Sequence, residues 1–217
     1  MRIPTLYDAA RVLSMSPGFQ QFPGGGPHGK SQSRLTASPP STTADIPGGS
    51  PFGFCEVSRS IDLFSITSVE LTKQPIYIDD DFLVHIYGTF QDSFAPNATI
   101  TVRADCGSHC EEYGAPPGER PGESISADFC EMSGIEQPLG GLETNVTCPP
   151  QEGHALISSP GYIMPMFFHA PGWYNFTVDA KTADGERIYC LTTEVCLRWE
   201  DEDKNKGYPP GPWTNCT

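Results

Sequence analysis

Cysteines are the residues of this 217-residue chain whose type and spacing most directly suggest chemistry. All eight follow residue 54, and an even number of thiols in one region favours disulfide pairing in an oxidising compartment. Four Asn-x-Ser/Thr sequons occur in the same region, as expected for an exported glycoprotein. We therefore predict four disulfides and N-linked glycans. The cysteines are Cys55, Cys106, Cys110, Cys130, Cys148, Cys190, Cys196 and Cys216, and the sequons begin at Asn97, Asn145, Asn175 and Asn215.

Two short clusters resemble metal sites but lack the required ligands. Cys106 and Cys110 flank His109, yet structural zinc needs four ligands, so a small disulfide loop is the better interpretation. Residues 79–81 are three consecutive aspartates, whereas calcium takes six to eight oxygens at wider spacing. We interpret these aspartates as a solvated turn and predict neither a metal nor a cofactor.

No residues form a recognisable catalytic set. The motifs G-x-S-x-G and H-E-x-x-H are absent, and the five histidines have no metal-ligand spacing. His85 is expected on a surface or strand edge rather than at a metal. A Ser/His/Asp set assembled by folding is the alternative that would make the protein an enzyme. We predict that it is not one.

The net charge of −14 limits the partners that the chain can bind. The negative charge lies after residue 50, because the first 50 residues are net positive. An acidic domain repels phosphate backbones, which excludes nucleic acid and disfavours strong binding to anionic membranes, while transient membrane contact remains compatible. No stretch is long and apolar enough to span a membrane.

The two ends differ in composition from the middle of the chain. Residues 1–47 are rich in Pro, Gly and Ser, which predicts disorder, with a pro-segment or a partner-binding tail as the alternative. The start lacks the apolar run of a signal peptide, so we expect either that the signal lies upstream or that export is unconventional, and we favour the first. Residues 200–217 read as an acidic tail, which leaves a domain at 48–199.

A hairpin centred on Asp184-Gly185 is the element around which the domain is organised. The preceding residues alternate apolar and polar, as in a strand with one buried face. Asp-Gly is a strong turn signal, and a two-residue loop would pair Val178 with Leu191 and Tyr174 with Val195. The resulting hairpin needs a second sheet over its apolar face.

Further strands can be read from the same alternation. A shift of apolar phase between Ile66 and Val69 predicts a bulge in the first of them. Residues 107–128 and 131–147 are expected to be loops. About seven strands without a convincing helix predict an all-β, immunoglobulin-like two-sheet sandwich. The other expected strands cover residues 63–71, 82–90, 97–105 and 154–158.

The order of motifs resembles the ML lipid-recognition domain. It is closest to the fungal phosphatidylglycerol/phosphatidylinositol transfer proteins, with the Niemann–Pick-type sterol carriers as more distant relatives. The resemblance covers residues 48–197. It rests on GGSPFGFC, IDLFSITSVEL, FLVHIYGTF, the spacing from Cys130 to CPP at 148–150, and APGWYNFTVDAKTADGERIYCL.

The resemblance implies two sheets that splay apart around an internal apolar cavity for a lipid. It also implies the disulfides Cys55–Cys190 and Cys130–Cys148. The pairs Cys106–Cys110 and Cys196–Cys216 are our own completion of the set.

The implied function is that of a secreted or vacuolar/lysosomal-lumen monomer that holds a sterol or phospholipid between its sheets and transfers it between membranes. Each buried CH₂ is worth about 0.8 kcal/mol, against about 1 kcal/mol for a head-group hydrogen bond, so we expect selection by chain length and cavity shape. The residues expected to contact lipid are Phe82, Val84, Ile86, Phe90, Ile100, Val102, Met164, Met166, Phe168, Tyr174, Phe176 and Val178.

The same apolar residues would also suit an ordinary packed core. Without the resemblance, the alternative is a secreted immunoglobulin-like adhesion or interaction module with a solid core and no ligand. Such a module would carry an exposed apolar patch instead of an internal site.

Overall fold

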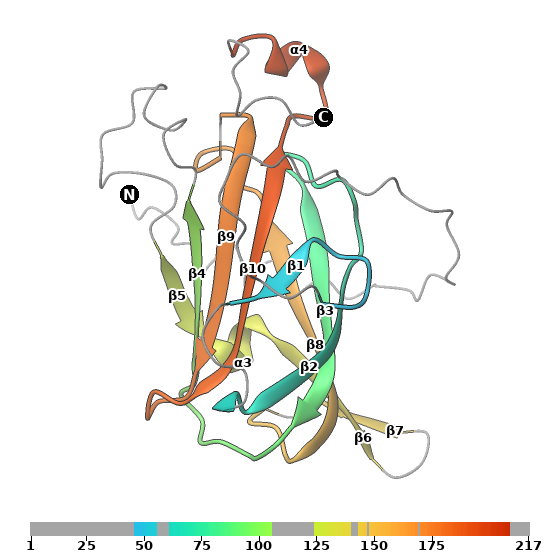
Figure 1. The fold of residues 1–217 in the computed structure, drawn as a ribbon, viewed down its shortest axis with the longest axis vertical. Coiled ribbons are helices and arrows are strands. Elements are labelled where there is room, and N and C mark those ends of the chain that lie inside the picture. Colours follow the sequence, from blue (N-terminus) through green and yellow to red (C-terminus); the bar gives the residue numbers. More distant parts are fainter. Residues whose placement is uncertain are drawn as a thin grey trace, which may run out of the picture. The chain divides into compact units, whose positions relative to one another are not determined.

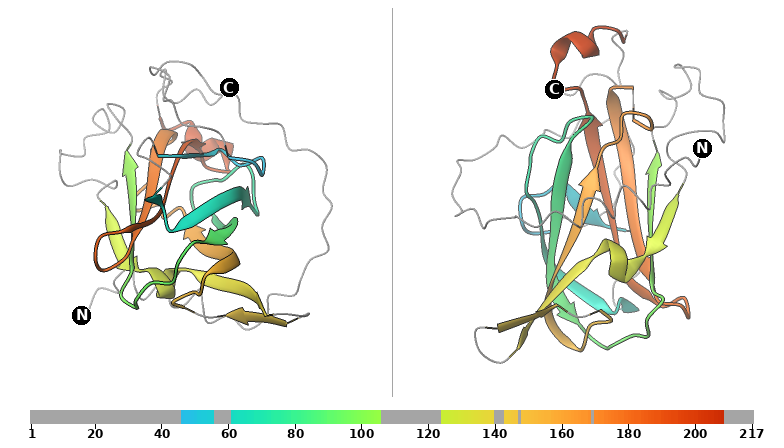
Figure 2. Two further views of the ribbon diagram at one scale, coloured as in Figure 1. Left: turned by 60° about the horizontal axis from the view of Figure 1, so that its bottom comes forward. Right: turned by 180° about the vertical axis from the view of Figure 1, so that it is seen from behind.

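Two antiparallel sheets of five strands each make up the part of the chain that the structure describes (Figure 1). This computed structural model describes residues 46–55, 61–105, 124–139, 143–146, 148–168 and 170–208. All of them belong to one unit, Gln32–Thr217. Figure 2 shows the two sheets facing each other, which confirms the predicted all-β sandwich. Among these residues, no helix is long and apolar enough to cross a membrane.

Each sheet combines strands from distant parts of the sequence. The first sheet has the order β1 (Phe52–Phe54), β10 (Arg187–Leu197), β9 (Gly172–Lys181), β4 (Thr99–Asp105) and β5 (Ile125–Asp128). The second has the order β2 (Phe64–Leu71), β3 (Asp81–Phe90), β8 (Gly153–Tyr162), β6 (Gly134–Leu139) and β7 (Glu143–Val146).

The central hairpin has the predicted register but not the predicted turn. Val178 pairs with Leu191, and Tyr174 pairs with Val195. The loop spans three residues, since the Thr182 amide donates to the Glu186 carbonyl and residues 183–185 lie between them. A bulge between Arg187 and Tyr189 adds one residue to β10 and restores the register. The prediction of a two-residue loop was therefore wrong. The predicted pairing is still correct, because the extra residue in the bulge compensates for the extra residue in the loop.

Two segments expected to be loops contain regular structure. The predicted bulge in β2 is confirmed between Ile66 and Ser68, but the expectation of about seven strands is too low. Residues 125–128 form β5 within the expected first loop. The second expected loop contains the last two residues of α3 (Phe129–Met132), together with β6 and β7. These elements are short and lack clear alternation, so periodicity gives no signal for them.

The acidic tail begins as folded structure. A single-turn helix, α4 (Glu202–Asn205), follows the last strand. The Asn205 side chain accepts a hydrogen bond from the Trp199 amide at 2.9 Å and donates one to the Trp199 carbonyl at 2.9 Å. Trp199 also forms a parallel bridge with Ile78. Packing thus extends beyond residue 199, and at the other end Ile46 is already buried in the core.

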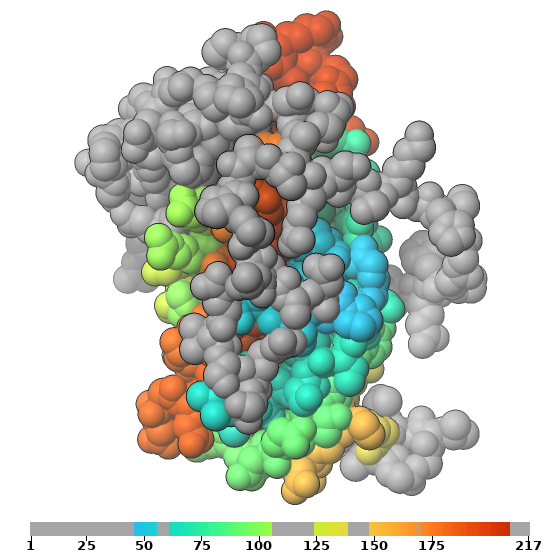
Figure 3. Space-filling model, in the orientation of Figure 1, coloured from blue at the N-terminus to red at the C-terminus, as the bar shows by residue number. Residues whose placement is uncertain are grey.

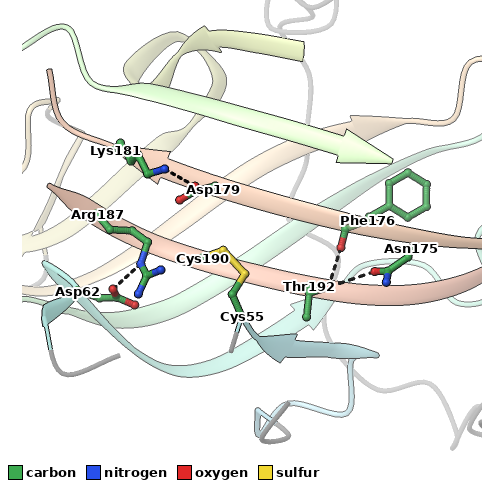
Figure 4. The surroundings of a disulfide bond; sticks show 9 residues. All are labelled: Cys55, Asp62, Asn175, Phe176, Asp179, Lys181, Arg187, Cys190 and Thr192. Atoms are coloured by element: carbon green, nitrogen blue, oxygen red, sulfur yellow. Dashed lines mark hydrogen bonds and ion pairs between the residues drawn. A yellow bond between two sulfur atoms is a disulfide. The ribbon is translucent and has the colours of Figure 1, made fainter. Parts of the chain in front are cut away.

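A nearly buried ion pair joins the two sheets beside the hairpin turn. Arg187 Nε donates to Asp62 Oδ1 at 2.7 Å (Figure 4). The Leu63 amide donates to the Arg187 carbonyl at 2.9 Å. The two side chains are only 12% (Arg187) and 7% (Asp62) exposed. Removing one partner would leave the other charge desolvated and poorly compensated.

We expect Arg187→Met to lower the free energy of unfolding by about 3 kcal/mol, because the nearly buried Asp62 carboxylate then loses its ion pair. Chemical denaturation of the purified protein measures this loss. The double variant Arg187→Met with Asp62→Leu should recover most of it, since no charge then remains buried. Equal losses in the single and the double variant would contradict this explanation.

Candidate functional site

Apolar side chains pack between the sheets in two buried clusters. The first cluster, called here the turn-end core, lies at the end of the sandwich that carries the β9–β10 turn, which Figure 3 shows at the surface in orange. Its largest fully buried members include Phe64, Phe90, Phe129 and Tyr189. The second, called the α4-end core, consists of Ile76, Ile78, Ile163, Tyr174, Val195 and Leu197, with Trp199 packed against it.

Between these clusters, inward-facing apolar side chains remain partly exposed. Val102 pairs with Val178 across β4 and β9, and both side chains face the interior. The next inward-facing pair on these strands, Ile100 and Ala180, is buried. On the opposite sheet, Phe82 and Val84 are in phase with buried Ile86, yet both are partly exposed. The central belt is defined here as Phe82, Val84, Val102, Phe176 and Val178. In a solidly packed sandwich these inner positions would be buried, as their neighbours are.

The edge of the first sheet adds a further exposed apolar side chain to this region. Ile125 on β5 pairs with Val102, so both point to the inner side of the sheet. Ile125 is nevertheless 45% exposed. The inner face is therefore accessible near β4 and β5.

A group of aromatic rings and a short loop lie at the α4 end of the central belt. The rings of Phe168, Tyr174 and Phe176 lie with centroids 5.5 to 6.2 Å apart. Tyr174 also donates its hydroxyl to the Ala170 carbonyl at 2.8 Å, which fixes the chain after the loop. The loop at residues 163–168 contributes Met164, Phe167 and Phe168, all partly buried.

Not every residue expected to contact lipid lies in the central belt. The expectation that Met166 points inward was wrong, because the side chain is 73% exposed at the loop. Pro165 ahead of it and the turn at residues 165–167 interrupt the strand alternation on which that expectation rested. Ile86, Phe90 and Ile100 belong to the turn-end core, and Tyr174 to the α4-end core.

Three polar side chains lie inside the sandwich, and two of them, both serines, were missed at the level of sequence. Ser133 and Ser159 point inward from the second sheet, with their hydroxyl oxygens 3.3 Å apart. The Tyr189 hydroxyl from the first sheet is completely buried beside Ser159, but it is not in full hydrogen-bonding geometry with Ser159 or with another atom of the described residues. Burial raises the pKa of Tyr189, and the Ser159 hydroxyl acts in the opposite direction, so the phenol stays protonated. Ser159 was missed because the predicted strand ended at residue 158.

The three aspartates are more structured than a solvated turn. Asp80 is buried and forms an ion pair with Lys73, while Asp79 accepts a hydrogen bond from the Tyr162 hydroxyl. The bond to Asp80 raises the pKa of Lys73, and the bond to Asp79 raises the pKa of Tyr162. Among the described residues no group of three or more His, Cys, Asp or Glu side chains is arranged to hold a metal ion. His85 lies on β3, a central strand, where its Nδ1 is 2.9 Å from Ser158 Oγ.

Two predicted disulfides are present in the described part of the chain. Cys55 is bonded to Cys190 and joins the segment after β1 to β10 (Figure 4). Cys130 is bonded to Cys148. Cys196 is disulfide-bonded as well. The other cysteines of the predicted set, Cys106, Cys110 and Cys216, lie outside the described residues.

The predicted glycosylation sites occupy different positions. Asn97 is exposed just before β4, with a φ of 85°. Asn175 is also exposed, on β9, and its Oδ1 accepts a hydrogen bond from Thr192 at 3.1 Å. Asn145 lies in β7, and Asn215 lies outside the described residues.

Comparison with known proteins identifies the family. A family model for the ML domain matches residues 49–197. The chain belongs to the ML domain family. This ML domain is 28% identical to the phosphatidylglycerol/phosphatidylinositol transfer protein of Kluyveromyces lactis over 161 residues, which are 72% of this chain and 80% of that protein. The protein of the same name in Eremothecium gossypii is 27% identical over 150 residues, 69% of this chain but only 61% of that protein.

A solved structure provides one further comparison for this ML domain. Chicken MD-1, crystallised in complex with lipid IVa, matches with a TM-score of 0.41 at 15% identity. The match covers 67% of this chain and 87% of that chain. The family membership thus rests on the sequence match, and the two-sheet sandwich on the strand topology itself.

Proposed function

We propose that this ML domain binds a sterol or a phospholipid between its two sheets and transfers it between membranes. The observation that carries the proposal is the central belt, five apolar side chains that face the interior and yet remain partly exposed. They lie between two closed cores, so a bound hydrocarbon chain would have apolar contacts on both sheets. The names of the two curated relatives support the lipid class.

The energetics favour a ligand with a long apolar part. Each methylene group buried in the central belt contributes about 0.8 kcal/mol, so eight of them contribute about 6 kcal/mol. A single head-group hydrogen bond contributes about 1 kcal/mol. Affinity should therefore follow the length of the buried chain more than the identity of the head group.

The remaining assignments follow from the same proposal. The protein acts by binding and not by catalysis, as a monomer in a secreted or vacuolar/lysosomal lumen, where the disulfides remain oxidised. Residues 48–199, together with the packed flanks at Ile46 and α4, form the lipid-binding domain, and the exposed Asn97 and Asn175 carry glycans. The alternative of a solid-core interaction module is not favoured, because the chain belongs to a family whose named relatives here are lipid-transfer proteins.

Transfer requires contact with a membrane, and the loop at residues 163–168 suits that role. Its apex carries Met166, 73% exposed, and Met164, Phe167 and Phe168 lie beside it. The loop follows β8 at the α4 end, where the Phe168 ring packs at a tilt against Phe176 of the central belt. An apolar apex next to the binding region would let a lipid pass from the bilayer to the interior without crossing water.

We expect Met166→Asp to slow lipid transfer between vesicles about fivefold while leaving equilibrium binding unchanged. A carboxylate at the apex removes on the order of 1 kcal/mol of apolar membrane attraction. Transfer of a fluorescent sterol or phospholipid between neutral phosphatidylcholine vesicles measures the rate. Ile61→Asp is the matched control, since Ile61 is 69% exposed and lies beside Asp62 at the turn end.

The transfer assay also tests the proposal itself. Wild-type protein should accelerate transfer of at least one of the two lipid classes. Equal slowing by Ile61→Asp and Met166→Asp would place membrane contact elsewhere. Absence of both binding and transfer with sterols and phospholipids would contradict the proposed function.

A further inference from the structure

A buried polar group lies where the central belt meets the turn-end core. Ser133 and Ser159 approach within 3.3 Å on the second sheet, and Tyr189 faces them from the first. The rings of Phe64 and Phe129 both lie close to Tyr189, with centroids 6.3 and 6.2 Å from its own. The Tyr189 ring thus belongs to the turn-end core, while its hydroxyl lies on the side of Ser159.

Ser159 connects this polar group to the accessible part of the interior. It pairs with Val84, a member of the central belt, and both residues are partly exposed although they face inward. The next inward residue toward the turn end, Ile157, is completely buried. A ligand that fills the central belt would therefore reach Ser159 as it meets the turn-end core.

The hydrogen-bonding capacity of the group is not used up. A serine or tyrosine hydroxyl offers one donor and two acceptor positions. The bond between Ser133 and Ser159 uses one donor. The Tyr189 hydroxyl lies close enough to Ser159 to affect the pKa of the phenol, but it is not in full hydrogen-bonding geometry with Ser159 or with another atom of the described residues. A buried hydroxyl that is incompletely hydrogen-bonded is destabilising, and a second hydroxyl that enters along the central belt would complete its bonding. The raised pKa of Tyr189 keeps the phenol protonated and able to donate.

We propose that Tyr189 and Ser159, supported by Ser133, form a polar subsite that binds a hydroxyl group on the leading, buried end of the lipid. This inference rests on the proposed function and adds an orientation to it. A hydroxyl suits the subsite because it accepts from Tyr189 and donates to a serine oxygen. A terminal methyl group would leave Tyr189 unpaired. The matching ligands are a sterol that enters with its 3β-hydroxyl first and an acyl chain hydroxylated at its far end.

Two ligand pairs test the subsite in the full-length protein. The sterol pair is cholesterol and its analogue without the 3-hydroxyl, and the acyl pair is hexadecanoic acid and 16-hydroxyhexadecanoic acid. Competition against a fluorescent lipid measures their affinities. Wild-type protein should prefer the hydroxylated member of at least one pair about tenfold, as expected for a hydrogen bond formed away from water. The pair that shows the preference identifies the source of the hydroxyl.

Single-residue variants then show which side chain causes the preference for the hydroxylated ligand. Tyr189→Phe should abolish it and leave the affinity for the non-hydroxylated member unchanged. Thermal unfolding of the ligand-free variant should occur at the same or a higher temperature, because the unpaired hydroxyl is gone. Ser158→Ala, on the opposite face of β8 beside His85, is the matched control and should keep the preference.

The outcomes separate the subsite from the general function. Binding of all four ligands without preference would overturn the subsite and leave lipid binding intact. A preference that survives Tyr189→Phe would also overturn it. If neither member of either pair binds, and sterols and phospholipids fail as well, the subsite and the proposed function fall together.

Discussion

Replacing Val84 by tryptophan should weaken lipid binding about thirtyfold. Val84 belongs to the central belt, and its side chain faces the interior from β3. A larger side chain there would displace two to three methylene groups of a bound chain, at a cost of about 2 kcal/mol. Because the position is partly exposed, the added ring should not overpack a closed core. Titration with a fluorescent sterol or phospholipid measures the loss.

The neighbouring residue on the same strand provides the control. Leu83 is also partly exposed, but it points to the outer face, and its cross-strand partner is Pro160. Leu83→Trp adds the same ring outside and should leave affinity within about twofold of wild type. Equal affinities of the Val84→Trp variant and wild type would mean that the ligand does not occupy the central belt.

Removing the Cys55–Cys190 disulfide should cause the largest loss of stability. The bond closes a loop with a sequence separation of 135 residues and fastens the segment after β1 to β10. In the chain-entropy description, a bond across a loop of this length stabilises the fold by about 4 to 5 kcal/mol. The double variant Cys55→Ala with Cys190→Ala should lose that amount in chemical denaturation.

The second described disulfide tests the dependence on loop length. Cys130–Cys148 has a sequence separation of only 18 residues, and its removal should cost about 3 kcal/mol. A larger loss from the short loop than from the long one would show that local strain or packing, and not chain entropy, dominates. Both double variants should be compared as oxidised protein from the same host.

The strands with clear alternation could be predicted from the sequence, and so could their pairing in the hairpin. Val178 and Leu191 are partners because an apolar face must pack on one side of both strands. The exact turn was not predictable, since a three-residue loop followed by a bulge gives the same pairing as a two-residue loop. Short strands such as β6, with Pro138 and a single buried isoleucine, carry no periodic signal.

Sequence patterning identified inward positions but not which of them stay accessible. Ile100 and Val102 both face inward from β4, yet Ile100 is buried and Val102 is partly exposed. That difference depends on how far apart the sheets lie at each level, a property of packing across the sandwich. Ser159 shows a second limit of sequence patterning. A serine in a strand is predicted to face outward unless the pairing of neighbouring residues shows that it faces inward.

The central claim is that the space between the two sheets holds a lipid, and native mass spectrometry tests it most directly. The full chain should be secreted from a eukaryotic host, purified without detergent and measured intact, followed by lipid extraction. We expect a mass increment of one sterol or phospholipid per protein, lost in the Val84→Trp variant and retained in Leu83→Trp. A folded wild-type protein that carries no lipid and takes up neither class from vesicles would contradict the claim.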